Sequence, residues 1–329
     1  MEKIKLGILG ISGHFIKRVL IPLKNSSLID IYAIASRSKE KAKETAEKYG
    51  IGTYYSSYEE LLEDDYIKLV YIPLPNNMHA KWIKKAADAG KHIICEKPIA
   101  MNAIEAKEAI DYAKSKNVLI TEAFMYKFHP QWQRVSELVD VGEIGKITLV
   151  NTVFSYSNID PKNIRNIKTS GGGAIMDIGC YAVSVPRLIY KKEPIRVISL
   201  TNNDKNFDTD ILSSAILDFG YERAVFTVAT QSYPHQRVEI FGTGGIITIN
   251  IPFNTFPDVP ARVTIKTDVG IREFSTPPAD HYGLEFEQFA RSIMKEEPLI
   301  NPPEDAINNM KVIDALFESS KNNSWINMK

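Results

Sequence analysis

The chain has few cysteines, no net charge and no long apolar run, and each absence excludes a class of protein. Only two cysteines, Cys95 and Cys180, occur in 329 residues, and neither has a partner at a metal-binding spacing. We therefore expect reduced packing cysteines, with no disulfide and no metal site. The 40 Lys and Arg residues balance 40 Asp and Glu residues, so no overall field attracts nucleic acid or an anionic membrane.

The N-terminus also lacks the features of a targeting or spanning segment. Its apolar run is broken by glycines and has no small-residue cleavage site, unlike a secretory signal. No stretch approaches the roughly 18 apolar residues of a membrane span. These absences predict a cytoplasmic protein. A single core rarely exceeds about 250–300 residues, so this length predicts two domains.

Short apolar runs alternate with helical patterns in the first part of the chain. The runs at residues 4–9, 29–35, 68–72, 92–95 and 118–121 are separated by helices, among them one that begins at Ser38 and ends at Gly50 and one that begins at Asn102. Alternation of this kind predicts an α/β domain with a doubly wound parallel sheet at residues 1–123.

Residues 124–329 have a different pattern, rich in β-branched segments separated by turns, such as the hairpin at Gly242–Gly245. Helices are expected at about 132–139, 173–190, 284–294 and 304–320. This pattern predicts an α+β domain for substrate binding and oligomerisation, with a large, mostly antiparallel open sheet. The last helix could pack back on the first domain. One face of the sheet needs a cover, which predicts a homodimer or homotetramer.

The turn after the first strand carries glycines that could bring backbone N–H groups and a helix N-terminus onto a pyrophosphate. Compared with the G-x-G-x-x-G pattern, serine and phenylalanine replace the second and third glycines, and a plain turn is the alternative interpretation. The predicted cofactor contacts in this turn are Gly10, Ile11, Ser12, Gly13, His14 and Phe15.

The second strand ends in Ser36 and Arg37, without the carboxylate that would bind the ribose hydroxyls of NAD. An arginine there favours the additional phosphate of NADP, so NADP is the predicted cofactor and NAD the alternative. A solvated Arg37 without this role is the competing interpretation.

Two further turns follow neighbouring strands, and parallel strands present ligands at their carboxyl ends. One turn holds Glu96, Lys97 and Pro98. The other contributes Leu74, Pro75, Asn76 and His79. A helix cap for the polar residues and a solvated position for Lys97 are the ordinary alternatives. We predict that these turns contact the cofactor.

A glycine-rich entry, Ser170–Gly173, leads into a helix with Asp177 and Tyr181 four residues apart. That spacing places both on one helix face. The alternative is an exposed polar stripe. Arg165 lies in the polar loop before this helix and is either a substrate contact or a solvated residue.

These motifs together resemble the glucose-fructose oxidoreductase, inositol dehydrogenase and MocA family (Gfo/Idh/MocA). They include the first glycine turn, Pro75-Asn76 with His79, Glu96-Lys97-Pro98, Glu122–Pro130 and Gly171–Tyr181. The resemblance extends over essentially the whole chain and is strongest to the dimeric dihydrodiol dehydrogenase-like branch. Two departures are the replaced glycines of the first turn and Lys127, where relatives often carry arginine.

The resemblance implies a Rossmann domain followed by an open-sheet domain that often forms the subunit interface. It also implies that Lys97 contacts cofactor and substrate next to a cis bond to Pro98, and that Tyr181 is the general acid/base. The predicted catalytic residues are Lys97, Tyr181 and Asp177. The predicted substrate contacts are Lys97, Tyr126, Arg165, Asp177 and Tyr181.

The chemistry of these side chains agrees with that assignment. Tyrosine, with an ordinary pKa of about 10, acts as a base near neutral pH only if a cation favours its phenolate, and Lys97 could supply that charge. We therefore predict an NAD(P)-dependent oxidoreductase that transfers hydride to or from a secondary alcohol or carbonyl of a sugar, polyol or diol. The alternative is a non-catalytic NAD(P) sensor on the same scaffold.

Overall fold

The computed structural model describes residues 2–328 and divides into two units. Unit 1 comprises the chain up to Met125 together with His281–Ile307, and unit 2 comprises Tyr126–Asp280 together with the chain from Asn308 onward. Within the described part of the chain, no helix has the length and apolar composition needed to cross a membrane.

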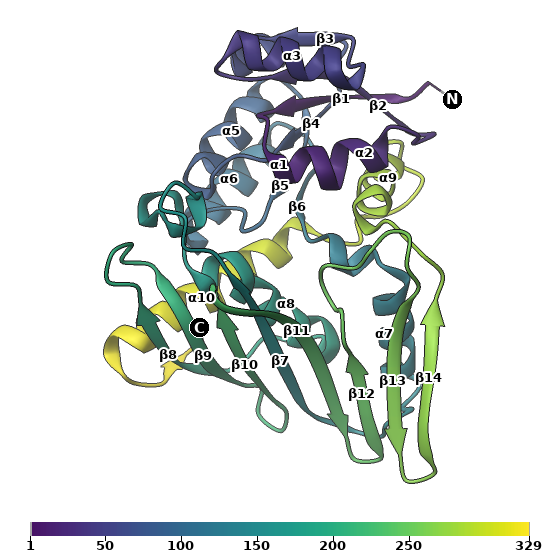
Figure 1. Cartoon of the computed structure of the whole chain (residues 1–329), viewed down its shortest axis with the longest axis vertical. Helices are drawn as coiled ribbons and strands as arrows, with labels where there is room; N and C mark the ends of the chain where they lie inside the picture. The colour runs from purple at the N-terminus through teal and green to yellow at the C-terminus, as the bar shows by residue number, and fades with distance from the viewer. Residues whose placement is uncertain (1, 329) are drawn as a thin grey trace. The chain divides into compact units, whose positions relative to one another are not determined.

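The core of unit 1 is a six-stranded sheet in the order β3-β2-β1-β4-β5-β6 (Figure 1). Every pair is parallel, so the predicted doubly wound sheet is confirmed. The order reverses between β1 and β4, which is where such sheets bind ligands. The strands are β1 (Ile4–Leu9), β2 (Ile29–Ala35), β3 (Thr53–Tyr55), β4 (Leu69–Ile72), β5 (His92–Glu96) and β6 (Ile120–Ala123).

The helices of unit 1 begin and end largely where the sequence signals indicate. Ser38 and Asn102 accept hydrogen bonds from the backbone N–H groups of the first turns that follow them, and Gly50 adopts the left-handed conformation at the end of its helix. The helices are α1 (Gly13–Phe15), continued by the π-helical η1 (Ile16–Leu20) and by α2 (Ile21–Leu23), then α3 (Lys39–Tyr49), α4 (Tyr58–Leu62), α5 (Asn76–Asp88), α6 (Ala103–Ser115) and α9 (His281–Ile293).

Helix α9 lies in unit 1, whereas the sequence analysis placed the domain boundary at residue 123 and assigned everything after it to the second domain. The ring of Phe286 packs 5.1 Å from that of Tyr71 on β4, and the Ser26 hydroxyl donates to Glu287 at 2.7 Å. These contacts bury the apolar face of α9 against unit 1. Unit 1 therefore contains a segment, residues 281–307, that is distant in sequence.

Unit 2 is built on a nine-stranded sheet in the order β14-β13-β12-β11-β7-β10-β9-β8-β15. Only β7 and β10 pair in parallel, so the predicted mostly antiparallel sheet is confirmed. The strands are β7 (Ile147–Ser157), β8 (Arg196–Asn203), β9 (Asp210–Asp218), β10 (Arg223–Ala229), β11 (Gln231–Gly242), β12 (Gly245–Ile249), β13 (Ala261–Thr267), β14 (Gly270–Thr276) and β15 (Ile326–Asn327).

The helices of unit 2 pack on one face of this sheet (Figure 1). One contact is the hydrogen bond from the backbone N–H of Ser199 on β8 to the Ser319 hydroxyl of α10, at 3.0 Å. On the opposite face, the exposed apolar side chains include Leu200, Leu212, Ile216 and Val225. The helices are η2 (Met125–Phe128), α7 (Pro130–Asp140), η3 (Ile164–Asn166), η4 (Lys168–Ser170), the π-helical η5 (Ile175–Gly179), α8 (Cys180–Tyr190) and α10 (Pro303–Asn322), and the division between the units falls within α10.

Candidate active site

The glycine turn after β1 places its backbone where the sequence analysis expected a phosphate loop. Gly10 has φ +120°, and a Cβ at this position would lie only 2.9 Å from Cδ2 of Leu74. A side chain here would therefore strain the backbone and crowd the neighbouring turn. A Cβ at Gly13 would meet no atom within 4 Å, so the helix start is open to the approach of a ligand.

The two departures from the glycine pattern have local explanations. Ser12 caps the helix, since its Oγ accepts a hydrogen bond from the Phe15 N–H at 3.0 Å. The Phe15 side chain is fully buried and packs with its ring centre 6.2 Å from that of Tyr71. Ser12 thus satisfies a backbone donor at the helix start, and Phe15 fills the core beneath the loop.

The end of β2 carries a cluster of hydroxyl and cationic groups beside this loop. The Ser36 Oγ accepts a hydrogen bond from the Ser38 N–H at 3.2 Å. Burial raises the pKa of Tyr58, and the guanidinium of Arg37 opposes that rise through its charge and a hydrogen bond. Lys41, on α3, donates from Nζ to the Ile11 carbonyl at 3.1 Å. Lys41 carries no signal in the sequence for this position, because only the fold brings α3 back to the loop.

His79 joins the two turns that follow β4 and β5. Its Nδ1 lies 2.9 Å from the Pro98 carbonyl and its Nε2 lies 2.8 Å from the Leu74 carbonyl, and the side chain is fully buried. Burial lowers the pKa of His79, so a neutral ring that donates to one of the two carbonyls is favoured. Both ring nitrogens face protein carbonyls. His79 therefore connects the two turns, and its predicted contact with the cofactor stays a prediction.

At the end of β5, the Glu96 carboxylate accepts two hydrogen bonds from neighbouring residues. It accepts hydrogen bonds from the Tyr71 hydroxyl and, at 3.3 Å, from the Lys97 N–H. It also lies 3.7 Å from Nε2 of His14 in the phosphate loop. Burial, and then the nearby Glu96, raise the pKa of Tyr71 well above its ordinary value, so the phenol remains a donor.

The peptide bond between Lys97 and Pro98 is cis, as the family resemblance implies. Glu96 and Lys97 are both half-buried, so the charged pair lies at the edge of the core. Pro75 directly precedes α5, and Asn76 is its first residue. The turns that carry the predicted cofactor contacts thus all belong to unit 1. Tyr71, which holds Glu96, could not be predicted as a site residue because it lies within the apolar strand β4.

In unit 2, the run Gly171–Gly173 folds the preceding loop onto the start of a helix. The Gly173 N–H donates to the Arg165 carbonyl at 2.9 Å. A Cβ at Gly172 would lie only 2.4 Å from that carbonyl oxygen. The glycines therefore permit a close backbone approach that places Arg165 beside the helix.

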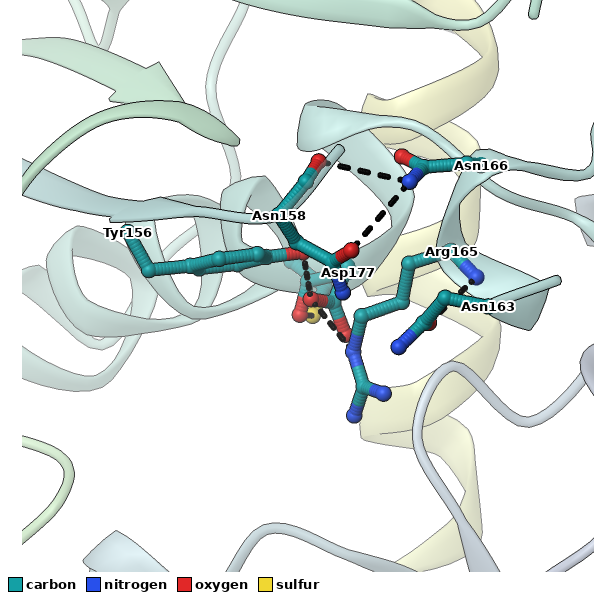
Figure 2. Close-up of polar contacts among 7 residues, drawn as sticks. Tyr156, Asn158, Asn163, Arg165, Asn166 and Asp177 are labelled. Atoms are coloured by element: carbon teal, nitrogen blue, oxygen red, sulfur yellow. Dashed lines mark hydrogen bonds and ion pairs between the residues drawn. The ribbon is translucent and has the colours of Figure 1, made fainter. Parts of the chain in front are cut away.

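Asp177 is the centre of a polar cluster in unit 2 (Figure 2). Its Oδ2 accepts hydrogen bonds from the Tyr156 hydroxyl at 2.7 Å and from Nε of Arg165 at 2.9 Å. Burial, and then the negative charge of Asp177, raise the pKa of Tyr156. The loop that carries Arg165 is held by Asn166, whose amide donates to the Asp160 carbonyl at 2.9 Å.

The side chains of Asp177 and Tyr181 are 12% and 5% exposed, so the alternative of an exposed polar stripe is wrong. Arg165, at 38% exposed, is ion-paired and not simply solvated. No sequence signal indicates Tyr156, which is separated from Asp177 by 21 positions and belongs to a different element.

Tyr181 lies among aromatic rings. Its ring centre is 5.0 Å from that of Phe253 and 5.9 Å from that of Phe154. Tyr126 also contacts it at 6.0 Å, but Tyr126 is fully buried and its hydroxyl shares a hydrogen bond with Ser184 Oγ at 2.8 Å. Tyr126 therefore packs beside Tyr181, and its predicted contact with substrate stays a prediction.

Cys95 and Cys180 are both buried, and within residues 2–328 neither forms a disulfide. Between residues 2 and 328, no group of three or more His, Cys, Asp or Glu side chains is arranged to hold a metal ion.

Comparison with known proteins identifies the family. Residues 4–124 match the model of an oxidoreductase family with an NAD-binding Rossmann fold, and residues 132–248 match the Gfo/Idh/MocA C-terminal domain. A D-xylose 1-dehydrogenase (NADP(+)) from Haloferax volcanii is 38% identical over 98% of this chain and 99% of its own length. A trans-1,2-dihydrobenzene-1,2-diol dehydrogenase from Xenopus tropicalis is 33% identical over 67% of this chain and 66% of its own length.

Among solved structures, a 3-ketoreductase from Actinomadura kijaniata, in complex with NADP and TDP-benzene, superposes with a TM-score of 0.91. It is 28% identical in sequence, over 97% of this chain and 98% of that one. The chain therefore belongs to the Gfo/Idh/MocA family of NAD(P)-dependent oxidoreductases.

Proposed function

We propose that this protein uses NADP(H) to interconvert a secondary alcohol and a carbonyl on a sugar or a related polyol or diol. The observation that carries the proposal is the turn Glu96-Lys97-Pro98 at the carboxyl end of β5, with Glu96 bonded to Tyr71 and close to His14 of the phosphate loop. A charged lysine next to a cofactor loop at this edge of a parallel sheet is suited to chemistry at the nicotinamide. The relatives named for D-xylose oxidation and for ketoreduction support a carbohydrate substrate.

In this proposal, Tyr181 is the general acid/base and Lys97 supplies the positive charge that makes its phenol a competent proton donor and acceptor near neutral pH. The bound dinucleotide supplies or accepts the hydride. Asp177, held by Tyr156 and Arg165, binds a substrate hydroxyl. The aromatic rings around Tyr181 exclude water from its ring face.

The preference for NADP rests on the groups at the end of β2. Ser36, Arg37 and Lys41 supply hydroxyl and cationic donors of the kind that bind a 2′-phosphate. The Asn76 and Pro75 turn and the residues Gly10 to Phe15 complete the proposed cofactor contacts. The name of one relative includes NADP(+), and the similar 3-ketoreductase structure is a complex with NADP, which agrees with this preference.

The test is turnover of NADP(H) against a panel of aldoses, ketoses, inositols, diols and dicarbonyls. We expect at least one sugar or polyol to be consumed, and Lys97→Met and Tyr181→Phe each to lower kcat by at least about a hundredfold while NADPH affinity changes little. Near-normal turnover in either variant contradicts the assigned roles. NADPH binding without turnover of any compound supports the alternative, a non-catalytic sensor.

We also propose that unit 2 forms a homodimer or homotetramer through its sheet. The exposed apolar side chains on β8, β9 and β10 include Leu200 at 66% exposed. Paired positions continue this surface across the strands, since Val225 is opposite Ile216 and Ile216 is opposite Ile198. Exposed apolar patches of this kind typically mark interfaces.

A further inference from the structure

The helix that carries Asp177 and Tyr181 begins at a buried carboxylate from another element. Asp210, the first residue of β9, is only 5% exposed. Its Oδ2 accepts hydrogen bonds from the backbone N–H of Ile175 and from the hydroxyl of Ser213, both at 2.8 Å. Ser213 is itself buried. A carboxylate thus satisfies a donor at the helix start, in the way an N-cap residue does, from 35 positions away.

Gly173 provides a second, independent observation at the same place. Its φ is +120°, and a Cβ built on it would lie 2.0 Å from Oδ1 of Asp210. Only glycine therefore leaves room for this carboxylate. Gly173 also connects the loop that carries Arg165 to the helix that carries Asp177. Its N–H donates to the Arg165 carbonyl at 2.9 Å, and its carbonyl accepts from the Asp177 N–H at 3.0 Å.

Asp210 therefore contacts the backbone segments that carry the side chains of the candidate site. One carboxylate oxygen holds the backbone of Ile175, two residues before Asp177. The other lies against the glycine whose peptide groups bond to Arg165 and Asp177. The charge of Asp210 also acts on Tyr156, where it contributes to the raised pKa of that phenol. Loss of the carboxylate would release the first turn of the helix and the loop bonded to it.

We propose that Asp210 is a positioning residue of the active site, which fixes the start of the helix so that Asp177 and Tyr181 hold the orientation needed for proton transfer. This inference rests on the function proposed above for Asp177 and Tyr181. Asp210 itself contacts neither substrate nor cofactor in this role. Its effect on catalysis passes through the backbone at residues 173–177.

Asp218 offers a matched control on the same strand. It is also 5% exposed, and its carboxylate accepts from Nε of Arg196 at 2.8 Å and from the Gly220 N–H at 2.9 Å. We expect Asp210→Ala to lower kcat by about ten- to a hundredfold, since a displacement of about 1 Å at reacting groups can cost that much. The dissociation constant for NADPH should remain within about twofold, because the proposed cofactor contacts are in unit 1.

Asp210→Asn retains an acceptor for the Ile175 N–H, so we expect it to recover kcat to within about fivefold of wild type. Asp218→Ala should lower the melting temperature while kcat stays within about twofold of wild type. The inference is overturned if folded Asp210→Ala has wild-type kcat, or if Asp218→Ala loses kcat to the same degree. If Asp210→Ala does not fold, Asp210→Ser, whose shorter side chain keeps a polar group but does not reach the Ile175 N–H, is compared with Asp218→Ser, and the same outcomes decide.

Hydrogen exchange separates this inference from the proposed function. In Asp210→Ala, the amides of a peptide covering residues 173–181 should exchange at least about tenfold faster than in wild type or Asp218→Ala, whether or not any sugar is turned over. If that peptide exchanges in Asp210→Ala at the same rate as in wild type, the positioning role is rejected. Absence of sugar turnover in the wild-type protein, with the exchange difference intact, rejects the proposed function alone.

Discussion

Arg37 and Lys41 bring two positive charges to the end of β2. Lys41 donates a hydrogen bond from Nζ to the Ile11 carbonyl in the loop after β1. Burial raises the pKa of Tyr58, and Arg37 opposes that rise through its charge and a hydrogen bond. If both groups bind the 2′-phosphate, Arg37→Ala and Lys41→Ala should each raise the dissociation constant for NADPH by about tenfold, the effect of one charge-assisted contact. Affinity for NADH, which lacks that phosphate, should hardly change. Fluorescence titration with both cofactors measures the difference.

The control for this prediction is Lys43, on the same helix. Its Nζ lies 3.8 Å from the Glu47 carboxylate, and both side chains are exposed. Lys43→Ala removes the same charge from the same helix and should leave NADPH affinity unchanged. An equal loss for Lys43→Ala and Lys41→Ala would show that only net charge matters. Equal affinity of the wild-type protein for NADPH and NADH would reject the predicted preference for NADP.

His129 should make the stability of the protein depend on pH. Its Nδ1 accepts a hydrogen bond from the Gln131 N–H at 3.1 Å, which caps α7, and burial lowers its pKa to about 4. The unfolded chain takes up a proton near pH 6.5, before the folded protein does, so stability is full above that pH and is lost as the pH falls toward 4. Between pH 7 and 5 we expect the free energy of unfolding to decrease by about 1–2 kcal/mol.

Urea unfolding at pH 7, 6 and 5 measures this loss. His129→Asn retains an acceptor for the helix start but has no group that titrates in this range. Its free energy of unfolding should therefore decrease less than that of wild type as the pH falls. At pH 7 it should be less stable than wild type. If the two proteins lose the same free energy of unfolding between pH 7 and 5, another group causes the dependence.

The glycine turn before η5 is an element whose geometry can be tested directly. A Cβ at Gly172 would lie 2.4 Å from the Arg165 carbonyl oxygen, so Gly172→Ala must move the loop that places Arg165 beside Asp177. We expect a melting temperature lower by several degrees and a KM for the sugar higher by about tenfold, with little effect on NADPH binding. Gly52→Ala is the control, because a Cβ there meets no atom within 4 Å. Equal KM values for the two variants would contradict the role of this turn.

The helices and strands that the sequence predicted well are those with long apolar patterns and clear caps. Ser38 and Asn102 cap their helices as expected, and the buried strands β1, β4 and β5 coincide with predicted apolar runs. No strand was predicted at β3, β14 or β15, which all lie at sheet edges. Thr53–Tyr55 is only half-buried, and β14 is mostly exposed. Neither has the buried alternation on which recognition of a strand depends.

The same reasoning explains which parts of the candidate site could be predicted. Lys97 and Asp177 stand in local motifs, at a strand end and after a glycine run, so their neighbours in sequence indicate their role. Tyr71, Tyr156 and Asp210 act through partners 25, 21 and 35 positions away. Only the fold brings such pairs together. Tyr126 and His79 lie in family motifs, yet their hydrogen bonds are made within the protein.

For the molecule as a whole, the two units differ in how continuous they are in sequence. Unit 1 requires residues 281–307 from near the end of the chain. Glu285 and Phe286 of this segment are buried, and Phe286 packs on Tyr71, which in turn holds Glu96. A fragment that ends near residue 123 would therefore expose the apolar surface that α9 covers. The chain returns to unit 1 only after the strands from β7 to β14. The core of unit 1 is therefore completed by residues 281–307.

The sheet of unit 2 should determine the assembly of the protein. Leu200 and Ile216 are exposed on the face opposite the helices, and a stable interface needs about 800 Å² from each partner. Leu200→Lys and Ile216→Lys would bury charges in such an interface and should shift the proposed dimer or tetramer to a monomer. Light scattering after size-exclusion chromatography measures the mass. Ile104→Lys, at an exposed site on α6, should leave the assembly intact, and a monomeric wild-type protein would refute the proposed interface.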